Sequence, residues 1–295
     1  MICRNFLKIK TQLNKIVLKN YTNDTQSINQ QDHQPQFKRV ALILSGLGNE
    51  TGTDLYDAVS LMVNLNNLGV NVNFYSLPDQ MIESSRISRG KINDLSTLKP
   101  SEYQGIFLPG GNGVATNLTN YREKNEEFQV NEILENALIQ FHQDKKPIVT
   151  LGLAGIIAAK VFIKYSPRLT LGKQEQRDDG KVNFLEQESI KVLEKLGAIH
   201  VDRFSNNFQI DFENRIISTP ASLFNGFKRG VHTFECAQHV TKIAQQFFLG
   251  NQIRMSDYKS GQYKRREEQN MEGGQRNYRR RNNRNQEDDQ QTQEQ

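Results

Sequence analysis

Residues 146–160 contain the corner at which this sequence could do chemistry. The apolar run 148–151 leads into Gly152 and then into an Ala- and Ile-rich segment, which predicts a buried strand that passes directly into a helix. In such elbows the corner residue lies at the N-terminus of the helix, where a Cys or Ser is activated as a nucleophile. Gly152 accepts the strained backbone of a corner but brings no nucleophilic atom. The pattern therefore predicts a catalytic scaffold that lacks its catalytic atom.

Two glycine-rich loops accompany this elbow. Residues 45–53 follow the apolar run 38–45, and residues 109–113 follow a shorter apolar run. The first loop has the spacing G-x-G-x-x-x-G, which departs from the dinucleotide fingerprint, so nucleotide binding is not expected. The second loop contains Gly110 and Gly111, which either permit a tight turn or form a backbone nest for an anion.

The elements that must position these loops alternate between strands and helices. Continuous apolar runs predict parallel strands buried on both faces, and apolar residues at helical spacing predict helices that pack on them. Expected strands cover 38–45, 70–77, 105–108, 148–151, 168–171, 208–212 and 215–218, and expected helices cover 55–66, 130–141, the segment after Gly152, 189–196 and 231–248. This order predicts a doubly wound, mainly parallel α/β sheet sandwiched by helices, with the three loops together at the C-terminal edge of its strands.

Several motifs occur in the order seen in a known family. They are residues 44–48 (LSGLG) with 52–57 (GTDLYD), 88–95 (SRGKINDL), 108–113 (LPGGNG) with 117–120 (NLTN), 168–172 (RLTLG) and 218–221 (STPA). Over about residues 38–250 the chain resembles ElbB-type glyoxalase-like proteins of the PfpI and class I glutamine amidotransferase-like superfamily. The resemblance implies a flavodoxin-like fold, frequent dimerisation and, in active members, an elbow Cys assisted by a Glu from the first loop. Such members are credited with cofactor-free conversion of reactive 2-oxoaldehydes.

Carried onto this sequence, the elbow Cys of the family falls on Gly152 and its assisting Glu on Asp54. Loss of a covalent nucleophile removes several orders of magnitude of rate, because the remaining groups can only bind and polarise. Asp54 has an alternative role as the cap of the helix that starts near Leu55. No catalytic residue is assigned. The candidate ligand-binding residues are Gly46, Gly48, Asp54, Gly110, Gly111, Gly152 and Leu153.

The remaining Cys and His residues form no recognisable site. Cys236 falls in the pattern of the last helix and is interpreted as a buried small hydrophobe rather than a replacement nucleophile. His142, His232 and His239 show no ligand-like cluster, and His200 is interpreted as structural. We therefore expect neither a metal nor an organic cofactor.

Composition divides the 295 residues into one domain and two polar ends. Residues 1–36 and 251–295 are rich in Asn, Gln and charged side chains, whereas residues 37–250 hold nearly all the aliphatic side chains of a packed α/β domain. No apolar run approaches the roughly 18 residues that span a bilayer. The formal charge of +5 is no sign of nucleic-acid binding by itself, because the five basic residues of the acid-free segment 1–23 account for all of it.

Residues 1–23 resemble a mitochondrial targeting peptide, because they are basic, acid-free and amphipathic. One helical face holds Phe6, Ile9, Leu13 and Ile16. We expect residues 1–36 to be a targeting segment with a linker and the mature protein to lie in the matrix. An unprocessed basic arm is the alternative.

Two further polar segments are candidates for contact with partners. Residues 174–184 resemble a surface insertion, and residues 276–284 hold five arginines among Asn and Tyr, followed at once by the acids 287–289. Because these acids compete with phosphate, protein contact by the tail is favoured over RNA contact.

We interpret the chain as a catalytically degenerate glyoxalase-like domain that serves as a mitochondrial scaffold or accessory subunit of a larger assembly, such as a respiratory complex or a ribosome. Its partners are then proteins of that assembly or a second copy of the chain. Two alternatives stay open: a residual glyoxalase or hydrolase that acts on small reactive carbonyl compounds with water activated by Asp54, and a non-catalytic sensor of such a metabolite. A filled pocket at the three loops favours the scaffold, and an open polar pocket beside Asp54 favours the alternatives.

Mitochondrial import should depend on residues 1–23. A fluorescent protein fused behind about the first 40 residues should enter mitochondria, because the leader is basic and amphipathic. The same fusion without residues 1–23 should stay in the cytosol, and cleavage should fall before Lys38. A full fusion that remains cytosolic contradicts the prediction.

Overall fold

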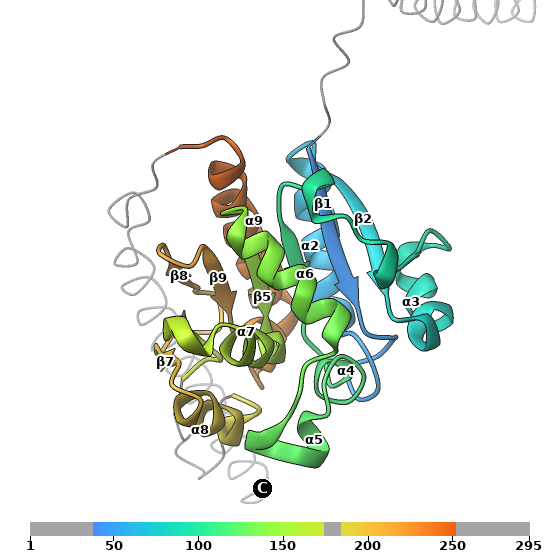
Figure 1. Ribbon diagram of the computed structural model, residues 1–295. Coiled ribbons are helices and arrows are strands. Elements are labelled where there is room, and N and C mark those ends of the chain that lie inside the picture. Colours follow the sequence, from blue (N-terminus) through green and yellow to red (C-terminus); the bar gives the residue numbers. More distant parts are fainter. Residues whose placement is uncertain (1–37, 174–183, 252–295) are drawn as a thin grey trace, which may run out of the picture. The chain divides into compact units, whose positions relative to one another are not determined.

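The computed structural model describes residues 38–173 and 184–251 (Figure 1). The expected targeting segment, the arginine-rich tail and residues 174–183 of the expected insertion lie outside these residues.

A seven-stranded sheet forms the centre of the described domain. In spatial order its strands are β3 (Asn93–Asp94), β2 (Asn71–Ser76), β1 (Arg39–Leu44), β4 (Ile106–Leu108), β5 (Ile148–Leu151), β9 (Ile216–Thr219) and β8 (Gln209–Asp211). Neighbouring strands are parallel except β8 and β9, which pair antiparallel and correspond to the expected strands 208–212 and 215–218. The strand order turns back at β1, which confirms the doubly wound, flavodoxin-like architecture and places its topological switch point between β1 and β4.

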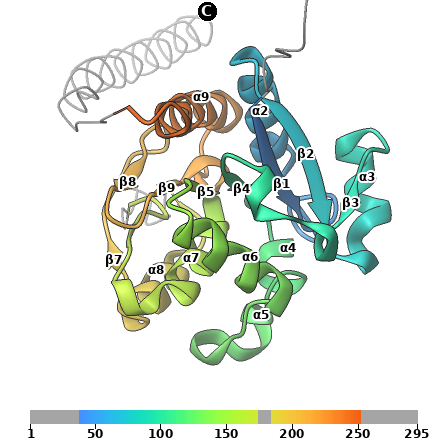
Figure 2. The ribbon, with the colours of Figure 1, turned by 45° about the horizontal axis from the view of Figure 1, so that its top comes forward.

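Helices cover both faces of this sheet (Figure 2). One face carries α2 (Leu55–Asn67) and α9 (Arg229–Phe248), and the other carries α6 (Glu132–Gln143), α7 (Gly155–Val161) and α8 (Gln187–Lys195). Strand β1 shows why both faces are needed: Val40, Leu42 and Leu44 pack on the α2 and α9 side, while Ala41 and Ile43 pack on the other. A strand with five consecutive apolar residues, 40–44, must be covered on both faces.

Smaller elements fill the connections. They are α3 (Met81–Ser88), α4 (Gly113–Thr116), α5 (Tyr121–Lys124), and the strands β6 (Arg168–Leu169) and β7 (Ile199–His200). The expected strand 168–171 therefore forms only at its first two residues, and β6 pairs in parallel with β7 in a separate two-stranded ladder.

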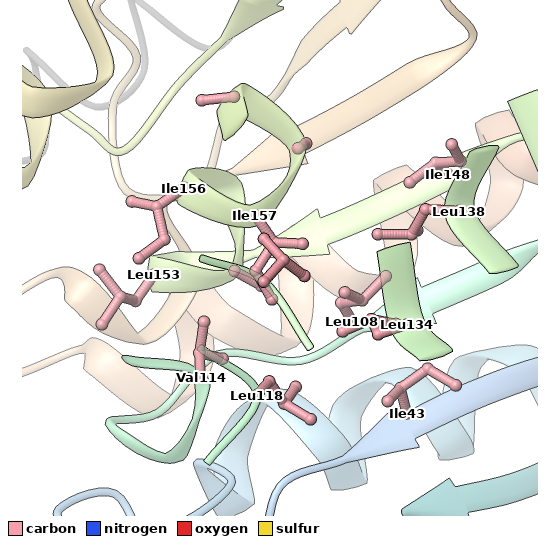
Figure 3. Close-up of a cluster of buried hydrophobic side chains, with 14 of the residues drawn as sticks. Ile43, Leu108, Val114, Leu118, Leu134, Leu138, Ile148, Leu153, Ile156 and Ile157 are labelled. Carbon is pink, nitrogen blue, oxygen red and sulfur yellow. The ribbon is translucent and has the colours of Figure 1, made fainter. Parts of the chain in front are cut away.

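The elbow helix α7 lies inside the larger hydrophobic cluster. Residues 155–159 are buried without interruption, so no side of this part of the helix faces solvent. Figure 3 shows Leu153, Ile156 and Ile157 of the elbow segment gathered near Val114 of α4. A helix that is apolar all round is a core helix, and its burial holds the preceding corner in place.

Candidate functional site

The corner between β5 and α7 is a short 3-10 turn, η5 (Gly152–Ala154). Gly152 has a φ of +54°, in the left-handed region. A Cβ atom at this residue would lie 3.4 Å from Asp57 Oδ2, 3.5 Å from Leu223 Cγ and 3.6 Å from the Pro220 carbonyl oxygen. The corner therefore faces a carboxyl group, an aliphatic side chain and a backbone carbonyl.

Asp57, in the first turn of α2, is the acid that meets the corner. Its side chain is fully buried. Oδ2 accepts a hydrogen bond of 2.9 Å from the Gly110 N–H, and Oδ1 accepts one of 3.2 Å from the Ser222 N–H. One carboxyl group thus links the helix, the second glycine loop and the turn η7 (Ala221–Leu223) around Gly152.

Asp54, onto which the resemblance carries the assisting acid, is used as the N-cap of α2. Its Oδ1 accepts from the N–H groups of Tyr56 at 2.8 Å and Asp57 at 3.3 Å. Its Oδ2 forms an ion pair with Arg229 Nη2 at 3.3 Å. The capping role considered for Asp54 is therefore present, and the carboxyl nearest the corner lies three residues further on.

The electrostatics of this acid pair favour a protonated Asp57. Burial is the main cause, and the nearby Asp54 carboxylate adds to it; together they raise the pKa of Asp57 to about 8, although the N–H groups of Gly110 and Ser222 lower it. The Arg229 guanidinium forms its ion pair with Asp54 rather than with Asp57. At neutral pH the corner then presents a neutral acid, which can donate a hydrogen bond but is a poor base.

The three loops converge as the sequence predicts. The Asp54 N–H donates to the Gly110 carbonyl at 2.9 Å. Gly111 has a φ of +110°, and a Cβ there would overlap the Gly52 carbonyl oxygen. Only glycine permits this approach of the first and second loops.

The N–H groups of Gly46 and Gly48 donate hydrogen bonds within the protein. The Gly46 N–H donates to Ser84 Oγ at 2.9 Å, and the Gly48 N–H donates to the Thr53 carbonyl at 3.0 Å. The Leu153 side chain is buried in the cluster of Figure 3. Of the candidate ligand-binding residues, Gly110 and Gly152 therefore adjoin the Asp57 carboxyl, while these three serve packing and loop closure.

Cys236 offers no replacement nucleophile. Its side chain in α9 is fully buried, with Sγ 2.8 Å from the Ser205 carbonyl oxygen. Burial raises the pKa of the Cys236 thiol to about 12, so it stays protonated. This confirms the interpretation of Cys236 as a buried residue.

The histidines have structural partners. His200 Nε2 accepts from the Leu171 N–H at 3.2 Å, and His142 Nε2 lies 3.3 Å from Asn214 Oδ1. In residues 38–173 and 184–251 no three His, Cys, Asp or Glu side chains are placed to hold a metal ion. None of the helices in the same residues is long and apolar enough to cross a bilayer.

Together the doubly wound sheet, the elbow and the glycine loops define an amidotransferase-like α/β domain. No family model matches the chain. It is 32% identical over 204 residues to the human glutamine amidotransferase-like class 1 domain-containing protein 3, mitochondrial. The match covers 62% of this chain and 74% of that protein. It is 25% identical over 209 residues to the zebrafish ES1 protein, mitochondrial, covering 63% and 77% of the two chains.

The chain therefore belongs to the family of glutamine amidotransferase-like class 1 domain proteins that includes the ES1 proteins. An amidotransferase-like isoprenoid biosynthesis protein from Ehrlichia chaffeensis shares the fold, with a TM-score of 0.61 at 22% identity over 71% of this chain and 99% of that one. The relatives are named as mitochondrial proteins, which supports a mitochondrial location here.

Gly111→Ala should lower the free energy of unfolding by about 3 kcal/mol or more, because it combines a left-handed backbone with a clash between two loops. Gly90→Ala is the matched control, since Gly90 has a φ of +85° but no atom within 4 Å of its Cβ position. That control should cost about 1 kcal/mol, the strain alone. Urea unfolding measures both, and equal losses would contradict the role assigned to loop contact.

Stability should fall as pH rises from about 4, the ordinary carboxyl pKa, to about 8, the raised pKa of Asp57. In this window the folded chain keeps the Asp57 proton and the unfolded chain releases it, so higher pH favours unfolding. Urea unfolding at several pH values should show that Asp57→Asn removes this decline. Asp79→Asn, at an exposed carboxyl, should keep it; a variant at residue 57 with the wild-type pH dependence would refute the assignment.

Proposed function

We propose that this chain is a non-catalytic member of its family that acts in mitochondria as a scaffold or accessory subunit. The observation that carries the proposal is the composition of the elbow corner. The Cβ position of Gly152 is enclosed by Asp57, Leu223 and Pro220, and no thiol or hydroxyl nucleophile stands on the corner residue. Thiol-dependent conversion of a carbonyl compound needs a thiolate at this point.

Water activation by the remaining acids is disfavoured. A general base must be unprotonated and within hydrogen-bond reach of the water. Asp54 directs its two oxygens to the α2 cap and to Arg229, and the raised pKa of Asp57 keeps that carboxyl neutral at pH 7. The buried corner matches a filled site better than an open polar pocket, which favours the scaffold over a residual hydrolase or a metabolite sensor.

The mitochondrial names of the relatives support a mitochondrial location for this chain. Location on the matrix side, and membership of a respiratory complex or a ribosome, are parts of the proposal that the predicted leader and polar tail motivate. Migration of the native protein in a complex much larger than a dimer would support them.

Purified wild-type protein should convert methylglyoxal no faster than buffer, because the corner lacks a thiolate. Gly152→Cys should create a thiol that iodoacetamide labels in the folded protein no faster than the background of a Gly152→Ala control, because the corner is buried. Wild-type turnover above buffer that Asp57→Asn abolishes would overturn the proposal and restore an enzymatic function.

A further inference from the structure

Two Asn–Gly pairs occur in this sequence, and the fold holds them in different ways. Asn112–Gly113 belongs to the second glycine loop, and Asn225–Gly226 lies in the segment between η7 and α9. In an Asn–Gly pair the backbone nitrogen of the glycine can attack the side-chain amide carbon of the asparagine. Glycine favours this attack because it has no side chain in the way and allows the backbone to rotate. Each pair is therefore a candidate for chemical modification without an enzyme.

The Asn112–Gly113 pair is locked by three hydrogen bonds. Asn112 Oδ1 accepts from Arg122 Nε at 2.7 Å, and Asn112 Nδ2 donates to the Glu50 carbonyl at 2.9 Å. The Gly113 N–H, which contains the attacking nitrogen, donates to the Gly52 carbonyl at 2.9 Å. Ring closure at this pair would have to break all three bonds, so the fold protects Asn112.

The Asn225–Gly226 pair has no such restraint. Asn225 is exposed, and within residues 38–173 and 184–251 neither its side-chain amide nor the Gly226 N–H makes a hydrogen bond. The segment is anchored on either side of this amide instead. The Phe224 ring packs on Phe184 with 5.6 Å between the ring centroids, and the Gly226 carbonyl accepts from the Arg229 N–H at 3.0 Å. The Asn225 side chain can therefore rotate in solvent between fixed neighbours.

We propose that Asn225 is a site of non-enzymatic deamidation. The Gly226 nitrogen gives its proton to base and forms a bond to Asn225 Cγ. The bond between Cγ and Nδ2 breaks, ammonia leaves, and a five-membered succinimide ring closes. Water then adds to one of the two ring carbonyls, and the ring opens to aspartate or to isoaspartate. No atom is oxidised or reduced, and the only co-reactant is water.

The product introduces a negative charge just before α9. The two residues at the start of this helix, Lys228 and Arg229, are basic, and its first turn contains no acidic side chain. A carboxylate is favourable near a helix N-terminus, so the aspartate product should be tolerated. Isoaspartate instead adds one carbon to the path of the backbone between Phe224 and Arg229, both of which are anchored. This inference does not depend on the proposed function, because the reaction takes place on the chain itself.

Peptide mapping of the full chain during incubation in mildly alkaline buffer measures both pairs at once. Trypsin releases Asn225 in the peptide 216–228 and Asn112 in the peptide 92–122. In guanidinium chloride both asparagines should convert to acids at comparable rates. In the folded protein Asn225 should still convert, whereas conversion of Asn112 should be roughly 100-fold slower, because three hydrogen bonds must break first.

Asn225→Gln is the matched control, because it keeps the amide but would have to close a six-membered ring. This variant should show no conversion in the peptide 216–228 and an unchanged rate at Asn112. Isoaspartate should be detectable by fragmentation of the aged wild-type peptide 216–228. The proposal would be overturned by an Asn225 that stays intact in the folded protein while it converts in guanidinium chloride, or by equal rates of the two asparagines in the folded protein.

Discussion

The fold around the elbow depends on one buried carboxyl group. Asp57 accepts from the N–H groups of Gly110 and Ser222, and so connects α2, the second glycine loop and the turn after β9 at a single point. A buried acid without partners would be strongly destabilising, and here two backbone donors and retention of the proton reduce that cost. Because backbone N–H groups hold the Asp57 carboxyl in position, its placement does not depend on a side chain at residue 152.

The glycine motifs have a packing reason that is separate from catalysis. Gly111 lies so close to Gly52 that a side chain would overlap the facing backbone, and Gly113 is similarly crowded by Ser45. The N–H of Gly113 donates to the Gly52 carbonyl at 2.9 Å, which fixes the distance between the loops. The loops need these glycines in order to pack, so the presence of the glycines indicates the fold without indicating an activity.

Much of the architecture follows from local patterns. The runs that became β1 and β5 are apolar at nearly every position, and α2 and α6 have clear helical spacing, so the sheet, its winding and the Gly152 corner could be predicted. The short helix α3 could not be predicted, because its sequence MIESSRIS has a weak apolar pattern. The pairing of β6 with β7 outside the main sheet could not be predicted either, because no local sequence pattern indicates it. Asp57 was missed because Asp54 and Asp57 lie one helical turn apart: the sequence shows two acids near the elbow, but only the path of α2 decides which one caps the helix and which one turns inward.

Helix α2 links the interior of the site to the surface of the molecule. Its first turn directs Asp57 toward Gly152 and Tyr56 toward Gly230 of α9, while the Asp54–Arg229 pair joins the two helices at their N-terminal ends. Deprotonation of Asp57 would place a second negative charge beside Asp54 in a buried setting, where like charges repel strongly. That repulsion acts on the α2 N-terminus and on the contact between Asp54 and Arg229. The Asp57 carboxyl and the Asp54–Arg229 pair are therefore linked through the first turn of α2, in which Asp54 Oδ1 accepts the Asp57 N–H.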